Sequence, residues 1–247
     1  MSVPFFRRAQ PRLASARRAA AILLDILFPS CCLSCGADTT VTRAVLCQAC
    51  LDSISVRSAF FCPVCLGRIP DPNIRCHPDA KFLAGAAVSY DEPTVKELVR
   101  VLKYKGVREA AKPLGTFVAR HLELALPARY REGAIIVPVP LSRARERIRG
   151  YNQAEEIARI TAEILGLPLE LRLLLRTRNT KPQTEIKGRE QRLLNLKGSF
   201  TTEGDAMGRI VILVDDVYTT GATMREAAET LKAAGARRVI AVAAARA

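Results

Sequence analysis

Ile210-Val211-Ile212-Leu213-Val214-Asp215-Asp216-Val217-Tyr218-Thr219-Thr220-Gly221-Ala222-Thr223 is the stretch that decides the fold expected for this chain. The aliphatic residues 210–214 predict a buried strand, and a loop of small and hydroxyl residues, 219–223, leads from it into a helix. Doubly wound sheets bind ligands at the carboxyl ends of their strands. A helix N-terminus offers an anion free backbone N–H groups and the positive end of a dipole. The stretch therefore predicts an anion-binding loop; the alternative is an ordinary strand-to-helix turn.

Two adjacent carboxylates, Asp215 and Asp216, stand between that strand and that loop. Beside an anion they would repel it unless they served another purpose. The vicinal hydroxyls of a ribose supply that purpose, because carboxylates accept hydrogen bonds from hydroxyl groups. If the strand continues through the pair, the two side chains point to opposite faces and need not do the same work. The pattern therefore indicates a ligand with both a phosphate and a ribose.

Strands and helices alternate from about residue 82 to the C-terminus. Hydrophobic runs predict strands at 82–90, 134–139, 169–175, 210–214 and 239–244. Helical spacing and start and stop residues predict helices at 93–103, 113–126, 152–165 and 223–234. This alternation predicts an α/β fold with a doubly wound, mostly parallel sheet. Residues 176–198 are polar and basic, and we expect them to form a loop or a mobile flap.

The composition is that of a folded protein rather than a disordered one, with 49% hydrophobic and 25% charged residues in a chain of 247. The net charge of +14 favours polyanionic partners such as nucleic acid, phosphorylated ligands or anionic lipid; the alternative is a solvated, arginine-rich surface. The apolar run at 19–28 is too short to span a bilayer. We expect a basic amphipathic leader helix at 1–28, a small zinc-ribbon module at 29–80 and the α/β domain at 82–247.

All eight cysteines lie between Cys31 and Cys76, which is typical of metal binding in a reducing compartment, so we expect a cytoplasmic protein. Two Cys-x-x-Cys pairs have the spacing of a structural Zn²⁺ site: Cys32, Cys35, Cys47 and Cys50. Reduced thiols or an iron–sulfur cluster are the alternatives. A weaker second set combines Cys62, Cys65 and Cys76 with His77 or Asp79, although adjacent cysteine and histidine are awkward ligands for one ion. Both sets are expected to be structural or to serve docking, because fully thiolate-ligated zinc has no open position for water.

A second anion site is expected after the strand at 134–139, where arginines occur at every second position. Guanidinium groups at the end of a sheet strand suit a pyrophosphate, because they bind it bidentately. Lysines at the end of the helix at 93–103 could reach the same group, although a solvated helix end explains them equally well. The pyrophosphate-binding candidates are Ser142, Arg143, Arg147, Lys103 and Lys105. The alternative for the arginines is an exposed basic loop.

Several motifs resemble those of known families. The loop at 215–223 resembles the 5-phosphoribosyl-1-pyrophosphate (PRPP) signature of the type I phosphoribosyltransferases. With the segments 102–106, 138–142 and 149–155 and the polar positions between 176 and 195, the chain resembles the ComF family over about residues 20–247. These are competence-associated, phosphoribosyltransferase-like proteins with a zinc ribbon in front of the transferase-type domain. The resemblance implies the type I phosphoribosyltransferase fold.

The resemblance also implies a role for each matching residue. Asp215 and Asp216 would be the catalytic residues that face the ribose hydroxyls, and Mg²⁺ would bridge pyrophosphate and ribose oxygens. The 5-phosphate would be wrapped by Val217, Tyr218, Thr219, Thr220, Gly221, Ala222 and Thr223. A flap closing over PRPP would carry Arg176, Gln183, Arg192 and Asn195. Family members often complete the second metal set with another Cys-x-x-Cys pair, and Cys76-His77 departs from that pattern.

Two functions of different classes follow. In the first, a nitrogen nucleophile would attack C1 of PRPP and pyrophosphate would leave, with catalysis mainly electrostatic; no residue set identifies the acceptor. In the second, the chain would be a single-stranded-DNA-binding competence or DNA-uptake factor in which PRPP binding is regulatory. A PRPP-sensing regulator without turnover is a third reading. The expected partners are PRPP and, for the second function, single-stranded DNA or other DNA-uptake proteins; the oligomeric state is left open.

Overall fold

The computed structural model describes residues 30–177 and 198–247 of the chain. It divides into two compact units, Met1–Cys50 and Leu51–Ala247. The described part of the first unit consists of turns around its cysteines, and the helix α2, Gln48–Ser53, begins there. The leader helix expected at 1–28 lies outside the described residues.

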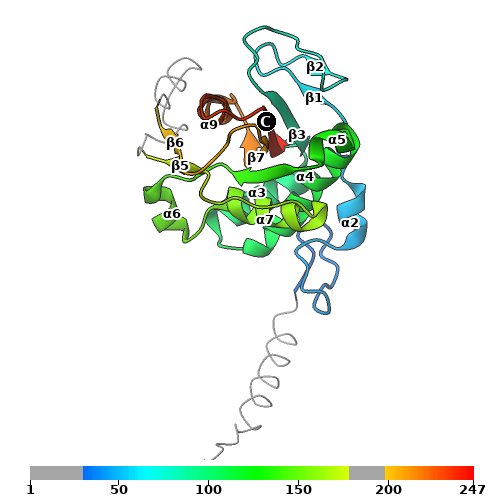
Figure 1. Ribbon diagram of the computed structural model, residues 1–247. Coiled ribbons are helices and arrows are strands. Elements are labelled where there is room, and N and C mark those ends of the chain that lie inside the picture. Colours follow the sequence, from blue (N-terminus) through cyan, green and yellow to red (C-terminus); the bar gives the residue numbers. More distant parts are fainter. Residues whose placement is uncertain (1–29, 178–197) are drawn as a thin grey trace, which may run out of the picture. The chain divides into compact units, whose positions relative to one another are not determined.

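The second unit is built on a six-stranded sheet in the order β2-β1-β3-β8-β7-β4 (Figure 1). Its four longer strands are parallel: β3, Leu83–Ser89; β8, Arg238–Arg246; β7, Ile210–Tyr218; and β4, Ala134–Pro138. A short antiparallel hairpin extends the β3 edge: β1, Phe60–Phe61, and β2, Arg68–Ile69. The fold class expected from the sequence, a doubly wound and mostly parallel sheet, is confirmed.

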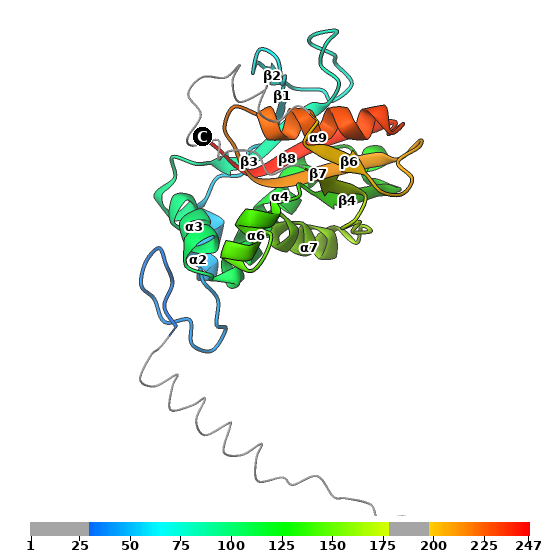
Figure 2. The same cartoon turned by 90° about the vertical axis from the view of Figure 1, so that its left-hand side faces the viewer.

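Helices cover both faces of the sheet, as Figures 1 and 2 show. α4, Ala111–Ala125, and α7, Gln153–Leu165, lie on the face that also carries α3, Pro93–Tyr104, and α9, Ala222–Ala233, covers the other. Shorter helices are the 3₁₀ turn η1, Arg108–Ala110, then α5, Ala128–Arg131, and α6, Arg143–Arg149. With both faces covered, the parallel strands are almost wholly buried, which explains their continuous apolar sequences.

Local signals place most of these helices. Pro93 occupies the first turn of α3, where its missing N–H costs no hydrogen bond. The side chain of Asn152 caps α7 by accepting a hydrogen bond from the backbone N–H of Ala154, and Gly166 ends that helix in the left-handed conformation. These two ends are where the sequence predicts them.

Three segments differ from the expectation. The strand expected at 169–175 is reduced to β5, Leu174–Arg176, which pairs with β6, Phe200–Thr202, in a separate two-stranded sheet. Leu169 makes only an isolated bridge to Ile136 at the edge of β4, so the apolar run is divided between two sheets. The arginine-rich segment after β4, for which an exposed basic loop is the alternative expected from the sequence, folds as the helix α6. β7 continues to Tyr218 because its ladder with β8 runs through both acids.

Within the described ranges, no helix has the length and apolarity needed to cross a bilayer.

Candidate functional site

The two acids lie near the carboxyl end of β7, inside the strand rather than after it. Successive strand residues face opposite sides of a sheet, and Asp215 and Asp216 have different surroundings accordingly. Asp216 is buried, and its Oδ1 lies 3.0 Å from Nζ of Lys103 at the end of α3. Asp215 is partly buried and accepts a 2.8 Å hydrogen bond from the backbone N–H of Asp216. Of the pair, Asp215 is the one left without the lysine as a direct partner.

The charges of this group shift its ionisation. Burial of Lys103 opposes its charged form, but the charge of Asp216 and their hydrogen bond outweigh burial and raise the lysine pKa. Burial and then the charge of Asp216 raise the pKa of Asp215 to about 7, against the lowering effects of Lys103 and Arg176. Asp215 therefore changes its charge near neutral pH, as acids and bases at functional sites often do. Its ribose-facing role stays a prediction, as does Mg²⁺.

The loop after β7 turns into α9 at Gly221. Gly221 adopts the left-handed conformation, with φ 73° and ψ 4°, directly before α9. A Cβ at this position would overlap Oη and Cζ of Tyr218, so glycine is required for space as well as for conformation. Thr220 Oγ1 is buried and has no hydrogen-bond partner among the described residues. A buried hydroxyl without a partner is costly unless a ligand or water satisfies it.

A small hollow, with a volume of about 30 Å³, lies between Asp215 and the loop. Its lining residues are Asp215, Val217, Tyr218, Thr219, Gly221, Ala222, Thr223 and Met224. Of the predicted phosphate-binding residues, all but Thr220 line this hollow, together with Asp215 but not Asp216.

The arginines after β4 are arranged by the helix α6 and not by a loop. Residues four apart share a helix face, so Arg145 and Arg149 face one way and Arg143 and Arg147 another. Arg143 and Arg147 are exposed, whereas Arg145 and Arg149 are partly buried and act electrostatically on Arg176 and on Lys103, respectively. Arg145 and Arg149, rather than the predicted Arg143 and Arg147, are therefore the pair whose charges reach Arg176 and Lys103. A helical rather than an alternating pattern in 143–149 is the signal that would have found them.

The remaining pyrophosphate candidates are divided. Lys103 contacts Asp216, whereas Lys105 is exposed at the C-terminal cap of α3. Ser142 is buried at the start of α6, and its side chain makes no capping hydrogen bond there. Pyrophosphate binding by these residues stays a prediction.

Arg176 is the flap candidate that the structure describes. It ends β5, and its guanidinium lies 5.3 Å from the ring centroid of Phe200. Burial and then the nearby charge of Arg145 lower the pKa of Arg176 to about 10, against the opposing effect of Asp215. The charges of Arg145 and Asp215 therefore both act on Arg176. Gln183, Arg192 and Asn195 lie outside the described residues.

The segment Tyr151-Asn152 connects the elements around the site. The Tyr151 hydroxyl donates a hydrogen bond to the backbone carbonyl of Leu102, next to Lys103. The Asn152 side chain donates to the carbonyl of Val139, at 3.1 Å, just after β4. These bonds join the start of α7 to the end of α3 and to the exit of β4. The Tyr151-Asn152 segment thus holds the end of α3, which carries Lys103, and the exit of β4 next to each other.

The first cysteine set forms a cluster suited to a tetrahedral ion. The sulfur atoms of Cys32, Cys35, Cys47 and Cys50 all lie within 4.8 Å of one another, and those of Cys35 and Cys47 are 3.7 Å apart. Four thiolates on one zinc ion would be separated by about 3.8 Å, given Zn–S bonds of about 2.3 Å. Burial opposes ionisation of Cys32, but N–H groups of Cys35 and Cys47 outweigh it and lower its pKa to about 6. The residues therefore fit a metal ion such as zinc.

The second set also closes, with His77 as its fourth member. Cys62 Sγ lies 3.4 Å from Nδ1 of His77, and Cys65 Sγ lies 3.6 Å from Cys76 Sγ. All four ligand atoms are within 4.8 Å of one another, so the adjacent cysteine and histidine do converge. These separations suit one tetrahedral ion with three thiolates and an imidazole. His121, by contrast, is fully buried beneath Phe60, with its ring at 72° to the phenyl ring, as a packing residue.

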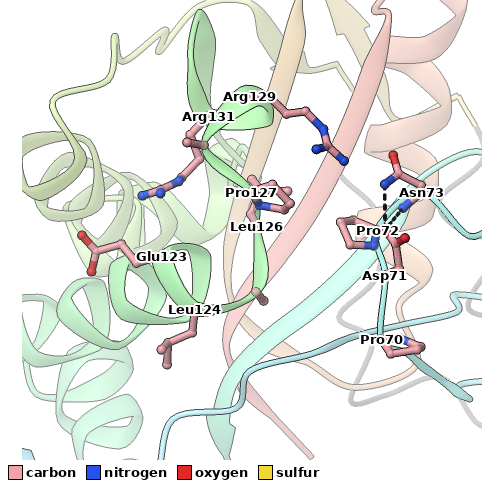
Figure 3. A pocket seen from close by; sticks show the side chains of 12 residues that line it. Pro70, Asp71, Pro72, Asn73, Glu123, Leu124, Leu126, Pro127, Arg129 and Arg131 are labelled. Carbon is pink, nitrogen blue, oxygen red and sulfur yellow. Dashed lines mark hydrogen bonds between the residues drawn. The ribbon is translucent and has the colours of Figure 1, made fainter.

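A larger hollow lies away from the acids, beside α5 (Figure 3). Its volume is about 510 Å³, and Figure 3 shows Arg129 pointing towards Pro72 and Asn73 on the facing loop. The first residue of β8, Arg238, donates to the carbonyl of Pro72 at 2.7 Å. This hollow is therefore at the amino ends of the strands. Neither the acid pair nor the loop 217–224 lines it, so it is separate from the candidate site.

Replacing Asp215 with Asn should raise the free energy of unfolding by about 1–3 kcal/mol near pH 8, because the neutral amide avoids a buried charge beside Asp216. The folded-state pKa of about 7 lies above the ordinary value of 3.8, so folding favours the protonated form and wild-type stability falls as the pH rises between these values. The gain from Asp215→Asn should therefore vanish as the pH approaches about 4. Urea unfolding across this range measures it.

Lys103→Met is the control of opposite sign. It removes the cation paired with Asp216, so it should lower the free energy of unfolding by roughly 1–3 kcal/mol near pH 8. A stabilisation by Asp215→Asn that is the same at both ends of the pH range would contradict the raised pKa.

Gly221→Ala should lower the free energy of unfolding by roughly 2–4 kcal/mol, because a methyl group would meet Tyr218 in a left-handed backbone. Gly166→Ala is the matched control. Gly166 is also left-handed, with φ 63°, but none of the described atoms lies within 4 Å of an added Cβ. It should therefore cost only about 1–2 kcal/mol. Equal losses in urea unfolding would show that Tyr218 does not restrict the loop.

Comparison with known proteins gives the same picture as the geometry. The family described as the phosphoribosyl transferase domain matches residues 106–247. The DNA utilization protein YhgH of Salmonella typhimurium is 29% identical over 225 residues, which cover 87% of this chain and 96% of that protein. The competence protein ComFC of Bacillus subtilis is 29% identical over 197 residues, covering 75% of this chain and 77% of that protein.

Among solved structures, the glutamine PRPP amidotransferase of Bacillus subtilis aligns with 55% of this chain and 26% of its own at 25% identity. The TM-score is 0.37, a likeness too slight to add to the topology described above. The domain match, however, spans more than half of the chain, and the YhgH and ComFC relatives align along most of it. The chain therefore belongs to the phosphoribosyl transferase domain family, as a type I phosphoribosyltransferase-like protein of the ComF kind.

Proposed function

We propose that residues 215–223 bind the 5-phosphoribosyl group of PRPP together with Mg²⁺. One observation carries the proposal: Thr220 Oγ1 is buried, has no hydrogen-bond partner among the described residues, and directly precedes the left-handed Gly221 at the start of α9. An anion at this point would satisfy the hydroxyl and the free N–H groups of the helix start. The domain family supports the same ligand class.

The neighbouring residues suit the rest of PRPP. Asp215, in its charged form, would accept hydrogen bonds from the ribose hydroxyls, while Asp216 is held by Lys103. Arg176 and Arg145 would face the pyrophosphate from β5 and α6, and both are partly buried, which strengthens their attraction to it. Mg²⁺ would neutralise part of the pyrophosphate charge through PRPP oxygens and water.

Transfer from this site would follow the phosphoribosyl pattern. A nitrogen nucleophile would form a bond to C1 while the bond from C1 to pyrophosphate breaks, and the bonding pair would leave with pyrophosphate. The arginines would stabilise that developing charge, and Asp215 would stabilise the positive ribosyl centre.

Calorimetric titration with PRPP and Mg²⁺ tests the binding site. Thr220→Val keeps the side-chain shape but removes the hydroxyl, so it should weaken PRPP binding by about 10- to 100-fold. Thr230→Val is the matched control, because Thr230 bonds to Glu226 within α9 and takes no part in the loop. Equal affinity in wild type and Thr220→Val would contradict the proposed site, and so would a wild type that does not bind PRPP.

DNA handling is the second candidate function. Relatives of this chain are named for DNA utilization and for competence, and the net charge of +14 favours polyanions. In this role PRPP would regulate or orient the binding of single-stranded DNA.

Fluorescence anisotropy with a single-stranded oligonucleotide at several salt concentrations tests the second function. The logarithm of the binding constant should fall linearly with the logarithm of salt concentration, with a slope of about −0.7 per phosphate contact. A flat dependence would exclude a substantial phosphate-contact surface. Adding PRPP at constant ionic strength should change the affinity for single-stranded DNA. An unchanged affinity would show that PRPP does not regulate DNA binding.

A further inference from the structure

Arg225 joins the first turn of α9 to the second cysteine cluster. Its backbone N–H donates to the carbonyl of Gly221 at 2.8 Å, at the end of residues 217–223, which we call the phosphate loop after the proposed function. Its Nη2 donates to the carbonyl of Pro63 at 2.7 Å. Pro63 follows Cys62, the most buried member of the Cys62, Cys65, Cys76 and His77 cluster. One side chain thus connects the two motifs, which are 162 residues apart.

A second contact runs parallel to the first. Phe61, directly before Cys62, packs edge-on against Tyr218, with ring centroids 4.9 Å apart and an interplanar angle of 84°. Tyr218 in turn occupies the space that a side chain at 221 would need. The guanidinium of Arg246 lies 4.4 Å from the Phe61 ring centroid and covers it. A shift of Phe61 would therefore move Tyr218, which packs against Gly221 in the phosphate loop.

The sheet alone holds this region weakly. β1 and β2 have two residues each, and one register pair, Phe61 with Ala84, joins the hairpin to β3. The hairpin lies on the α9 side of the sheet in both views (Figures 1 and 2). So short a two-stranded element is marginal in water without another constraint. A closed ligand cluster supplies one, because it joins the turn after β1 to Cys76 and His77.

We infer that a metal ion in the Cys62, Cys65, Cys76 and His77 cluster positions the phosphate loop, with Arg225 and Phe61 as the positioning residues. What the loop then holds, the phosphate of PRPP, rests on the proposed function. The ion takes no part in chemistry, since its four ligands leave no open position. Loss of the ion or oxidation of its thiolates would release Pro63 and Phe61 and loosen the turn from Gly221 to Arg225.

The Cys32, Cys35, Cys47 and Cys50 cluster makes a matched comparison. It lies in the other compact unit, Met1–Cys50, and has four cysteine ligands where the second cluster has three cysteines and a histidine. A general effect of metal loss on the chain should appear when either cluster loses its ion. Only the second cluster has Arg225 and Phe61 between itself and the loop.

Amide hydrogen exchange in the full-length chain, followed by mass spectrometry of peptides covering 218–226, tests the inference without any ligand. Cys65→Ser with Cys76→Ser should remove one of two bound zinc ions and speed exchange in these peptides roughly tenfold. Arg225→Met should retain both ions and produce a similar increase. Combining the two changes should add little, because both break the same connection.

Two variants serve as controls. Cys35→Ser with Cys47→Ser should also release one ion but leave exchange at 218–226 unchanged. Lys232→Met removes side-chain bonds from Lys232 to the carbonyls of Ala236 and Arg237 at the far end of α9, and should not affect the loop either. Arg225→Lys, which keeps the charge and a donor, should restore part of the protection.

The inference is overturned by any of three results: a wild-type chain with no ion in the second cluster, unchanged loop exchange after that ion is lost, or an equal effect of the first-cluster variant. A wild type that shows the expected exchange pattern but does not bind PRPP contradicts only the proposed function.

Discussion

Two adjacent carboxylates in a buried central strand require a compensating cation, and the pairing of Lys103 with Asp216 at 3.0 Å meets that requirement. The lysine is brought there by the last turn of α3, which Tyr151 holds through the carbonyl of Leu102. The next residue, Asn152, caps α7 and bonds to Val139 after β4. The ends of three elements are thus tied around the end of β7, and the local geometry of the site depends on one ion pair.

That ion pair also makes the two acids unequal. Asp216 has its cation, so its charge is compensated before any ligand arrives. Asp215 has a backbone N–H and the distant charges of Lys103 and Arg176, which do not offset burial and the repulsion from Asp216. A carboxyl group that is costly to ionise in the folded chain gains most from a ligand that donates hydrogen bonds to it. The strand alternation thus places Asp215 at the hollow and Asp216 beside Lys103.

The sequence predicts the sheet well because buried parallel strands are continuous apolar runs and the helix ends carry Asn152, Gly166 and Pro93. It misses the helix after β4. Arginines at every second position predict a pyrophosphate site or an exposed basic loop, whereas the segment forms α6, in which Arg145 and Arg149 are partly buried and Arg143 and Arg147 are exposed. The apolar run at 169–175 contains no signal for its division between two sheets, since that depends on pairing with residues 200–202. The sequence also does not predict that Lys103 pairs with Asp216, because β7 is more than a hundred residues away in the chain.

The phosphate loop shows why a motif alone does not determine a site. Its sequence supplies Gly221 and the hydroxyls, but its shape depends on Tyr218 against that glycine, Phe61 against Tyr218 and Arg225 bonded to Pro63. Two of these contacts reach the cysteine-rich hairpin, which lies at the edge of the same sheet and within the same compact unit. The six-stranded sheet therefore carries the two motifs as neighbours, although they are distant in the chain. A cluster that stabilises the hairpin cannot be energetically independent of a loop that shares its packing.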